Sequence, residues 1–396
     1  MKIICVGGGP AGLYFAILMK LRDASHDVTV IERNPAGVTY GWGVVFWDDL
    51  LDALYRCDPV SAREVHHSAI QWHDQEVHVG PGRAHIGGYG FSMSRKRLLD
   101  ILCQRATSLG ADVQFERSVA DPSELAGADL IVACDGAHSQ IRQRFAGHFQ
   151  TCAHEGRNKY IWLGTTKPFD AFTFAFEETP SGCIWFHGYR FDAAASTCIV
   201  ECAPETWNRM GFGELSSADG TGLLQDIFKG HLDGHPLMCQ TPVLGKAPWL
   251  NFVRITNGSW SRGNVVLMGD AAHTTHFSIG SGTKLAIEDA IALAENLDGR
   301  NDLSADLRSY ESQRKSALLP LQIEARDSAE WFETVDGREH EDSVQLAYSL
   351  WQRRNGPAPP QHWRYYVHLA TQRPVPRRAR RAVSSGRRWL HTHRRP

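Results

Sequence analysis

The chain opens with Lys2-Ile3-Ile4-Cys5-Val6-Gly7-Gly8-Gly9-Pro10-Ala11-Gly12, the stretch that decides the fold. Lys2–Val6 predicts a short buried strand, and an apolar helical pattern follows to about Leu21. A second strand, Asp27–Ile31, ends at Glu32, twenty residues after the last glycine. This order of elements predicts a Rossmann-like dinucleotide site: a strand, a Gly-x-Gly-x-x-Gly turn, a helix, and a second strand that ends in an acidic residue. The glycines let a pyrophosphate approach the backbone, and the acidic residue accepts from a ribose hydroxyl.

A second glycine-rich stretch lies about two-thirds along the chain and runs from Val265 to Gly282. Four apolar residues predict a buried strand that stops at Gly269-Asp270, and an apolar-periodic helix begins near Lys284. A helix N-terminus after such a turn offers unpaired N–H groups and partial positive charge. We therefore expect this turn to hold part of the ligand.

The segments between these stretches depart from a plain α/β pattern. Gly37 to Trp47 is a glycine- and aromatic-rich segment that predicts a loop, whereas Tyr160–Cys202 holds short strands at regular spacing, typical of an antiparallel sheet. The fold class predicted is α/β, with a discontinuous Rossmann-like domain, an inserted antiparallel β-sheet substrate domain and C-terminal helices. The predicted boundaries are 1–75, 92–150 and 257–300 for the nucleotide domain, 76–91 and 151–256 for the substrate domain, 301–370 for the C-terminal helical region, and 371–396 for a disordered basic tail.

Composition narrows the function classes. With 396 residues, 42% hydrophobic and 22% charged, the chain predicts a soluble globular protein with two interlocked domains. No apolar run approaches the roughly 18 residues of a membrane span, and the N-terminus does not resemble a signal peptide, so a cytoplasmic protein without membrane attachment is expected. The nine cysteines form no Cys-x-x-Cys pair, which favours reduced thiols over disulfides or a metal site.

The last 26 residues differ from the rest in charge. They contain nine arginines and no acidic residue, with few large apolar side chains. Such a segment is typical of a disordered tail. Because no aromatic-basic motif accompanies the arginines, we expect no nucleic-acid partner.

Three motifs stand in a fixed order: Gly7–Gly12 with Glu32, Asp135-Gly136 followed by Ser139 and Arg142, and Gly269-Asp270. Over about residues 1–335, the chain resembles the single-component FAD-dependent aromatic hydroxylases, the group of p-hydroxybenzoate hydroxylase. The resemblance implies an FAD cofactor, NADPH or NADH as a transient electron donor, and O2 as co-substrate. It also implies a C4a-hydroperoxide of the flavin that transfers one oxygen to an electron-rich ring.

The resemblance implies roles for individual residues. The first motif would bind the ADP part of FAD, the Asp-Gly segment would lie near the pyrophosphate, and Asp270 would accept from ribityl hydroxyls. Arg95 matches a family arginine near the flavin phosphates. The cofactor-binding residues predicted in this way are Gly7, Gly9, Pro10, Ala11, Gly12, Glu32, Arg33, Arg95, Asp135, Gly136, Gly269, Asp270, Gly280 and Gly282.

Within the family, the stretches Gly41–Phe46, Gly156–Trp162 and His276–Gly282 resemble the salicylyl-CoA 5-hydroxylase type. They also resemble the violacein-pathway type, which acts on a tryptophan-derived substrate. The substrate expected is a salicylyl-CoA-like or anthraniloyl-type thioester. The alternatives are a tryptophan-derived or other free aromatic compound, a flavin-dependent reductase or dehydrogenase, and a non-enzymatic FAD-binding protein. A homodimer is left open.

The family pattern changes beside the flavin. Most members have Pro where Phe277 stands, so His276 and Phe277 are predicted to line the substrate side. Histidine has a suitable pKa for removing a proton from a ring hydroxyl, which makes His276 the predicted base. His273 is the second candidate, although the family's histidine there is commonly structural. Three apolar residues are predicted to line the substrate pocket and exclude water: Trp42, Val44 and Phe46.

Overall fold

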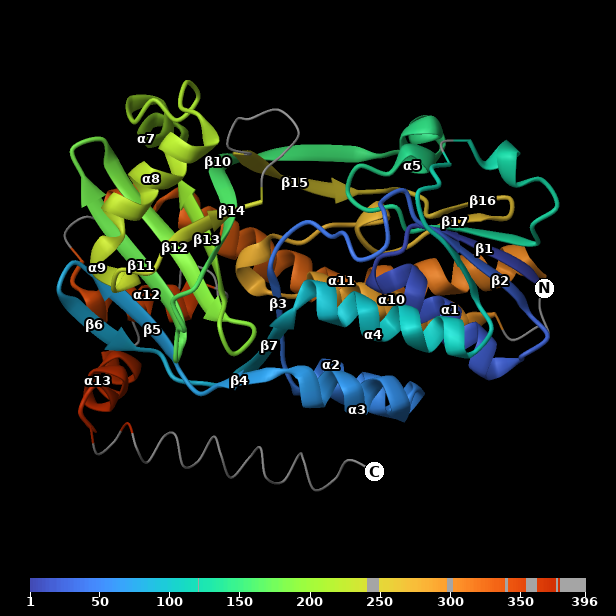
Figure 1. Cartoon of the computed structure of the whole chain (residues 1–396), viewed down its shortest axis with the longest axis horizontal. Helices are drawn as coiled ribbons and strands as arrows, with labels where there is room; N and C mark the ends of the chain where they lie inside the picture. The colour runs from blue at the N-terminus through green and yellow to red at the C-terminus, as the bar shows by residue number, and fades with distance from the viewer. Residues whose placement is uncertain are drawn as a thin grey trace.

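Two domains lie side by side, each built on its own β-sheet (Figure 1). The structure is a computed structural model that describes residues 1–119, 121–240, 249–297, 302–338, 341–353, 362–374 and 377. A six-stranded sheet has the order β16-β17-β9-β1-β2-β8. An eight-stranded sheet has the order β14-β10-β13-β12-β11-β5-β6, with β15 paired to β10. The predicted α/β fold class with an antiparallel sheet domain is confirmed.

The six-stranded sheet is parallel apart from β16, as a Rossmann-like unit requires. Its strands are β1 (Lys2–Val6), β2 (Asp27–Ile31), β8 (Asp112–Gln114), β9 (Leu130–Ala133), β16 (Ser261–Arg262) and β17 (Val265–Leu267). Its main helices are α1 (Pro10–Arg22), α4 (Arg95–Ser108) and α10 (Gly282–Asn296), and α1 packs on both others. Proline at the first turn suits α1 because that position needs no N–H donor.

The prediction of a loop over residues 37–47 is wrong for the second half of that segment. Gly43–Phe46 forms β3, which pairs with β7 (Gly90–Ser94), and β4 (Ile70–Trp72) pairs with the other side of β7. Glycine disfavours a helix, but it does not prevent a short strand when a partner strand supplies hydrogen bonds. Because β7 belongs to this small sheet, the predicted substrate-domain piece 76–91 ends too late by two residues. Helices α2 (Asp48–Cys57) and α3 (Pro59–Ser68) follow β3 in the chain.

The second sheet is antiparallel except where β5 pairs with β11. Its strands are β5 (Gln75–Val79), β6 (Gly82–His85), β10 (Cys152–Thr165), β11 (Phe172–Thr179), β12 (Gly182–Arg190), β13 (Ser196–Cys202), β14 (Leu237–Cys239) and β15 (Leu250–Thr256). One face packs on the helical segment that contains α7 (Pro204–Arg209), α8 (Ser217–Ile227) and α9 (Lys229–Leu232). The opposite face packs on C-terminal helices.

The long helix α11 (Leu303–Glu333) joins the two domains and runs through the middle of the molecule (Figure 1). Near its start, the Tyr310 hydroxyl donates to the Leu267 carbonyl of β17, 3.3 Å away. At its end, Phe332 stacks on Trp185 of β12 with ring centroids 6.0 Å apart. Helix α11 therefore packs on both domains. Helices α12 (Ser343–Gln352) and α13 (His362–Thr371) complete the region.

The start of the predicted tail is ordered against β6. The His85 N–H donates to Gln372 Oε1 at 2.7 Å, Gln372 Nε2 donates to the His85 carbonyl at 3.0 Å, and Arg377 contacts the His85 ring. The predicted boundary at residue 371 is therefore too early, because Gln372 satisfies both backbone groups of one strand residue. Most of the tail lies outside the described residues. None of the described helices is long and apolar enough to cross a membrane.

Candidate active site

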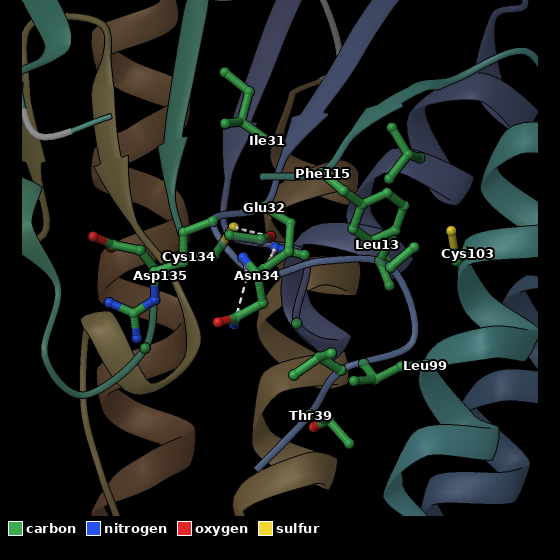
Figure 2. A pocket seen from close by; sticks show the side chains of 18 of the residues that line it. Leu13, Ile31, Glu32, Asn34, Thr39, Leu99, Cys103, Phe115, Cys134 and Asp135 are labelled. Atoms are coloured by element: carbon green, nitrogen blue, oxygen red, sulfur yellow. Dashed lines mark hydrogen bonds between the residues drawn. The ribbon is translucent and has the colours of Figure 1, made fainter. Parts of the chain in front are cut away.

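The first pocket has a volume of about 390 Å³ and lies beyond the carboxyl ends of β1 and β2 (Figure 2). Gly7, Gly8 and Gly9 form part of its wall. Behind them, Gly12 lies in α1 so close to β1 that an added Cβ would stand 2.2 Å from the Gly7 carbonyl oxygen. Helix and strand therefore touch backbone to backbone, the function of the last glycine in this motif.

Glu32, which the sequence predicts to accept from a ribose hydroxyl, lies at the centre of this pocket (Figure 2). Its Oε2 accepts from the Gly8 N–H at 2.8 Å, and its Oε1 accepts from the backbone and side-chain nitrogens of Asn34, both at 2.8 Å. A carboxylate offers about four acceptor positions, so three are used and one remains. Glu32 is thus held in place with capacity to accept from one further donor, such as a ribose hydroxyl.

Asp135 and Gly136 line the same pocket beyond β9. Asp135 Oδ2 accepts from the Gln140 N–H at 2.8 Å, whereas its buried Oδ1 has no partner among the described residues. Burial raises the pKa of the Asp135 carboxyl. Arg142, also buried, donates to the Ala271 carbonyl at 3.1 Å. The predicted Asp-Gly and Gly-Asp motifs are therefore tied together through Arg142.

Arg95 lies where the first pocket meets a second one and lines both. Its Nε donates to Thr39 Oγ1 at 3.2 Å, the one side-chain hydrogen bond of its guanidinium within the described residues. Burial lowers the pKa of Arg95, and the nearby Asp270 carboxylate opposes this. A largely buried cation with so few partners favours an anionic ligand at this junction.

The second pocket has a volume of about 340 Å³ and lies between the two domains. Asp270, Gly280 and Gly282 line one end, and burial raises the pKa of Asp270 while Arg95 lowers it. The other walls are largely aromatic and include Trp47, Trp72, Tyr160, Trp162, Phe172, Tyr189 and Phe277. A cavity of this shape and composition suits a flat aromatic ligand.

Of the three residues predicted to exclude water, Val44 alone lines this pocket. Phe46 is buried against Phe91, with stacked centroids 5.7 Å apart. Trp42 packs on β10, where an added Cβ on Gly164 would lie 2.6 Å from its indole. Trp42 and Phe46 therefore do not line the second pocket, because each packs against other parts of the protein.

The Gly269-Asp270 turn rests on a buried ionic network. Asp289 Oδ2 accepts from the Gly269 N–H at 2.9 Å and lies 2.8 Å from His273 Nε2, and Asp289 Oδ1 accepts from Arg314 Nε at 2.7 Å. Although burial favours the neutral acid, His273 and Arg314 hold the pKa of Asp289 below its usual value. These contacts give His273 a supporting place behind the turn. Gly269 itself adopts φ 63°, a backbone conformation that favours glycine.

His276 and Phe277 have different surroundings. Phe277 lines the second pocket, whereas His276 is not among the described residues that do. His276 Nδ1 lies 2.8 Å from Ser278 Oγ and accepts from the Ser278 N–H at 3.3 Å, which caps the short turn η3 (Phe277–Ile279). Burial lowers the pKa of His276 to about 4. The predicted base therefore uses one ring nitrogen to hold the turn.

Three polar residues at or behind the wall of the second pocket were not predicted from the sequence: His187, Glu201 and Arg353. His187 and Arg353 line the cavity, and Glu201 lies behind His187. The sequence does contain a signal for Glu201, because it is a charged residue inside the otherwise apolar run Ile199–Cys202. Arg353 follows α12, so the C-terminal region contributes to the site.

The predicted cofactor residues divide into three groups. Seven line the first pocket: Gly7, Gly9, Glu32, Arg33, Arg95, Asp135 and Gly136. Asp270, Gly280 and Gly282 line the second. Pro10, Ala11, Gly12 and Gly269 lie behind these walls and support them.

Comparison with known proteins agrees with this site. Residues 232–318, which contain the Gly269-Asp270 turn, match the family described as FAD binding domain. A salicyloyl-CoA 5-hydroxylase from Streptomyces sp is 41% identical over 84% of this chain, and the chain spans 65% of that protein's length. A 3-hydroxy-4-methyl-anthranilyl-[aryl-carrier protein] 5-monooxygenase from Streptosporangium sibiricum is 35% identical, covering 84% of this chain and 89% of the relative.

A third relative and a solved structure extend the comparison. The protodeoxyviolaceinate monooxygenase of Chromobacterium violaceum is 31% identical over 94% of this chain and 100% of its own. The structure of 2-methyl-3-hydroxypyridine-5-carboxylic acid oxygenase superimposes with a TM-score of 0.70 at 20% identity, covering 89% of this chain and 98% of the other, which shows a shared fold. With its two joined pockets and these relatives, the chain belongs to the FAD-dependent aromatic monooxygenases.

Proposed function

We propose that this protein hydroxylates an electron-rich aromatic ring and that FAD spans its two joined pockets. The observation that carries the proposal is the junction at Arg95, where a pocket with a dinucleotide motif meets an aromatic-lined pocket. This arrangement supports a nucleotide-binding site beside a cavity suited to an aromatic ring. The flavin, reduced by NADPH or NADH, supplies the oxygen chemistry.

The residues present fit FAD by three structural features. Gly7 and Gly12 leave no room for a side chain where α1 meets the end of β1, Glu32 retains an acceptor position, and Asp135 Oδ1 is buried without a partner among the described residues. Arg95 would meet the phosphates, and Asp270 would accept from ribityl hydroxyls. Gly280–Gly282, at the start of α10, would face the end of the cofactor nearest the substrate.

The substrate we favour is a salicylyl- or anthraniloyl-type thioester. Two of the relatives act, by their names, on a CoA-linked and a carrier-linked aromatic acyl group. A cavity of about 340 Å³ accommodates a ring but not a CoA or pantetheine arm as well, so the arm would leave past Leu250, a pocket residue that is 50% exposed.

A substrate panel tests the proposal. Salicyl and anthraniloyl thioesters, the free acids and tryptophan analogues would each be scored for stimulated NAD(P)H oxidation, O2 uptake and hydroxylated product. We expect a thioester to stimulate all three. A response to free indoles only would exclude the thioester, substrate oxidation without oxygen incorporation would indicate a dehydrogenase, and no response to any aromatic compound would contradict the hydroxylase.

Arg95 provides a prediction for cofactor affinity. Replacing Arg95 by Gln should raise the FAD Kd about 10- to 100-fold, because a hydrogen bond to a charged group contributes about 1.5–3 kcal/mol. FAD titration of the apoprotein, followed by quenching of flavin fluorescence, measures the change. The matched control is Arg97→Gln on the same helix, because Arg97 contacts Glu64 and Ser68 outside both pockets. Equal affinities for the two variants would contradict the role of Arg95.

A further inference from the structure

His187 is a buried histidine on the wall of the aromatic pocket. It lies on β12, is 2% exposed and lines the second pocket. Its ring packs edge-on against Phe277 at 5.6 Å and Phe174 at 5.1 Å, and lies 4.8 Å from Phe332. Three aromatic neighbours fix the plane of the imidazole. The second pocket also has His138 on its wall, but that side chain is exposed to solvent.

Glu201 lies beside one nitrogen of this ring at ion-pair distance, and no other described residue gives that nitrogen a hydrogen bond. Glu201 is 1% exposed, and its Oε2 lies 3.4 Å from His187 Nε2. Asn158 Nδ2 donates to Glu201 Oε1 at 2.8 Å, and Trp185 Nε1 donates to Oε2 at 3.2 Å. Although burial favours the neutral acid, His187 holds the pKa of Glu201 below its usual value. The residue is therefore a carboxylate at neutral pH.

A carboxylate beside Nε2 selects the tautomer of His187. The negative oxygen favours a proton on Nε2, which leaves the lone pair on Nδ1. This is the arrangement in which an acid residue prepares a histidine base in catalytic triads. Burial lowers the pKa of His187, and Arg353 acts in the same direction, so the imidazole is neutral and able to accept a proton.

We propose that His187, oriented by Glu201, accepts the proton of the substrate's ring hydroxyl while the ring is hydroxylated. The substrate O–H bond breaks, an N–H bond forms at Nδ1, and the electron pair stays on the substrate oxygen. The resulting phenolate is the more electron-rich form of the ring. The proton returns when the product forms, so the step needs no further oxidant or reductant. This inference rests on the proposed function.

The charged groups around His187 favour this transfer. Arg353 lies 5.8 Å over the rings of Phe174 and Phe332, on the same aromatic wall, and its guanidinium is fixed by Ser328 at 2.9 Å and the Ser278 carbonyl at 3.1 Å. A fixed cation there stabilises a phenolate in the pocket. Two other titratable neighbours are unsuited as bases: His276 Nδ1 bonds to Ser278, and burial raises the pKa of Tyr160 to about 12.

The test compares three variants of the full chain with FAD bound, using the panel compound that stimulates the unsubstituted enzyme best. His187→Gln should lower kcat about 10²- to 10⁴-fold, the usual contribution of a general base, and should remove the acidic limb of the kcat/KM pH profile. His276→Gln should keep that limb. Retention of the limb in His187→Gln, or its loss only in His276→Gln, overturns the proposal.

Glu201→Gln tests the positioning role without removing the base. A glutamine N–H can donate to His187 Nε2, which would place the ring proton on Nδ1 and block proton acceptance. We expect kcat to fall on the order of 10²-fold with FAD content unchanged, and KM to change little. If kcat and the pH profile match those of the unsubstituted enzyme, Glu201 does not set the tautomer.

A binding measurement tests the same proton transfer without turnover. In the absence of NAD(P)H, 5-nitrosalicyl-CoA would be titrated with pH in the pocket, because its phenolate absorbs visible light. The bound ligand should ionise at lower pH in the unsubstituted protein than in His187→Gln. Equal ionisation would overturn the inference. If the unsubstituted enzyme responds to no aromatic compound, the proposed function fails instead, so the two failures are distinguishable.

Discussion

Gly12→Ala is expected to abolish FAD retention and to destabilise the apoprotein by about 3 kcal/mol or more, at the upper end of overpacking costs. The added Cβ would lie 2.2 Å from the Gly7 carbonyl oxygen and 2.7 Å from Cys134 Sγ. A backbone oxygen cannot rotate away as a flexible side chain can. Either α1 or the Gly7 turn must move, and that turn forms the wall of the first pocket. Urea unfolding of the apoprotein and the visible flavin spectrum of the purified protein measure the two effects.

Gly9→Ala is the matched control, since it adds the same methyl group to the same motif. Nothing lies within 4 Å of an added Cβ at Gly9, and its φ of −77° suits alanine. The apoprotein should therefore unfold within about 0.5 kcal/mol of the unsubstituted chain. Its FAD affinity should still fall, because Gly9 lines the pocket where the pyrophosphate would approach. A Gly12→Ala apoprotein as stable as Gly9→Ala would contradict the packing argument.

The nucleotide half of the site follows from local sequence. Gly7–Gly12, Glu32 and Asp135-Gly136 each lie where a strand of the six-stranded sheet ends, and the carboxyl ends of parallel strands meet at one edge. Sequence order and spacing therefore suffice to bring these residues together. Their predicted roles toward FAD remain predictions, although all of them line the first pocket or support its wall.

The substrate half depends on contacts between distant segments. Trp185 pairs directly with Glu201 across β12 and β13, which puts His187 diagonally opposite that carboxylate. A shift of one residue in this register would move Glu201 to the other face of the sheet. Arg353 reaches the pocket only because α11 carries the chain from one domain to the other. No local pattern encodes either arrangement, so the sequence pointed to His276, which stands next to a recognisable motif, and not to the pair of His187 and Glu201 that we propose.

Asp289→Ala is expected to lower the free energy of unfolding by about 3–5 kcal/mol, because it leaves the buried Arg314 cation without its partner. Asp289 is fully buried and also accepts from the Gly269 N–H, so the Gly-Asp turn should loosen and FAD affinity should fall as well. Urea unfolding of the apoprotein at pH 7 measures the first effect. The control is Glu288→Gln: that side chain is 27% exposed and lies 3.2 Å from the same arginine, so its loss should cost at most about 1 kcal/mol.

The pH dependence of the loss in stability on replacing Asp289 distinguishes an effect of its charge from an effect of lost packing. Because the folded protein holds the pKa of Asp289 below its usual value, the carboxylate stabilises the fold fully above the unfolded-state pKa, about 4. That contribution falls progressively below this pH and is lost once pH has passed through the lower, folded-state pKa. The stability gap between the unsubstituted protein and Asp289→Asn, an isosteric variant, should therefore be constant from about pH 5 to 8 and should narrow below about pH 4. A gap that stays constant down to pH 3 would mean that the side-chain shape, and not its charge, supports the turn.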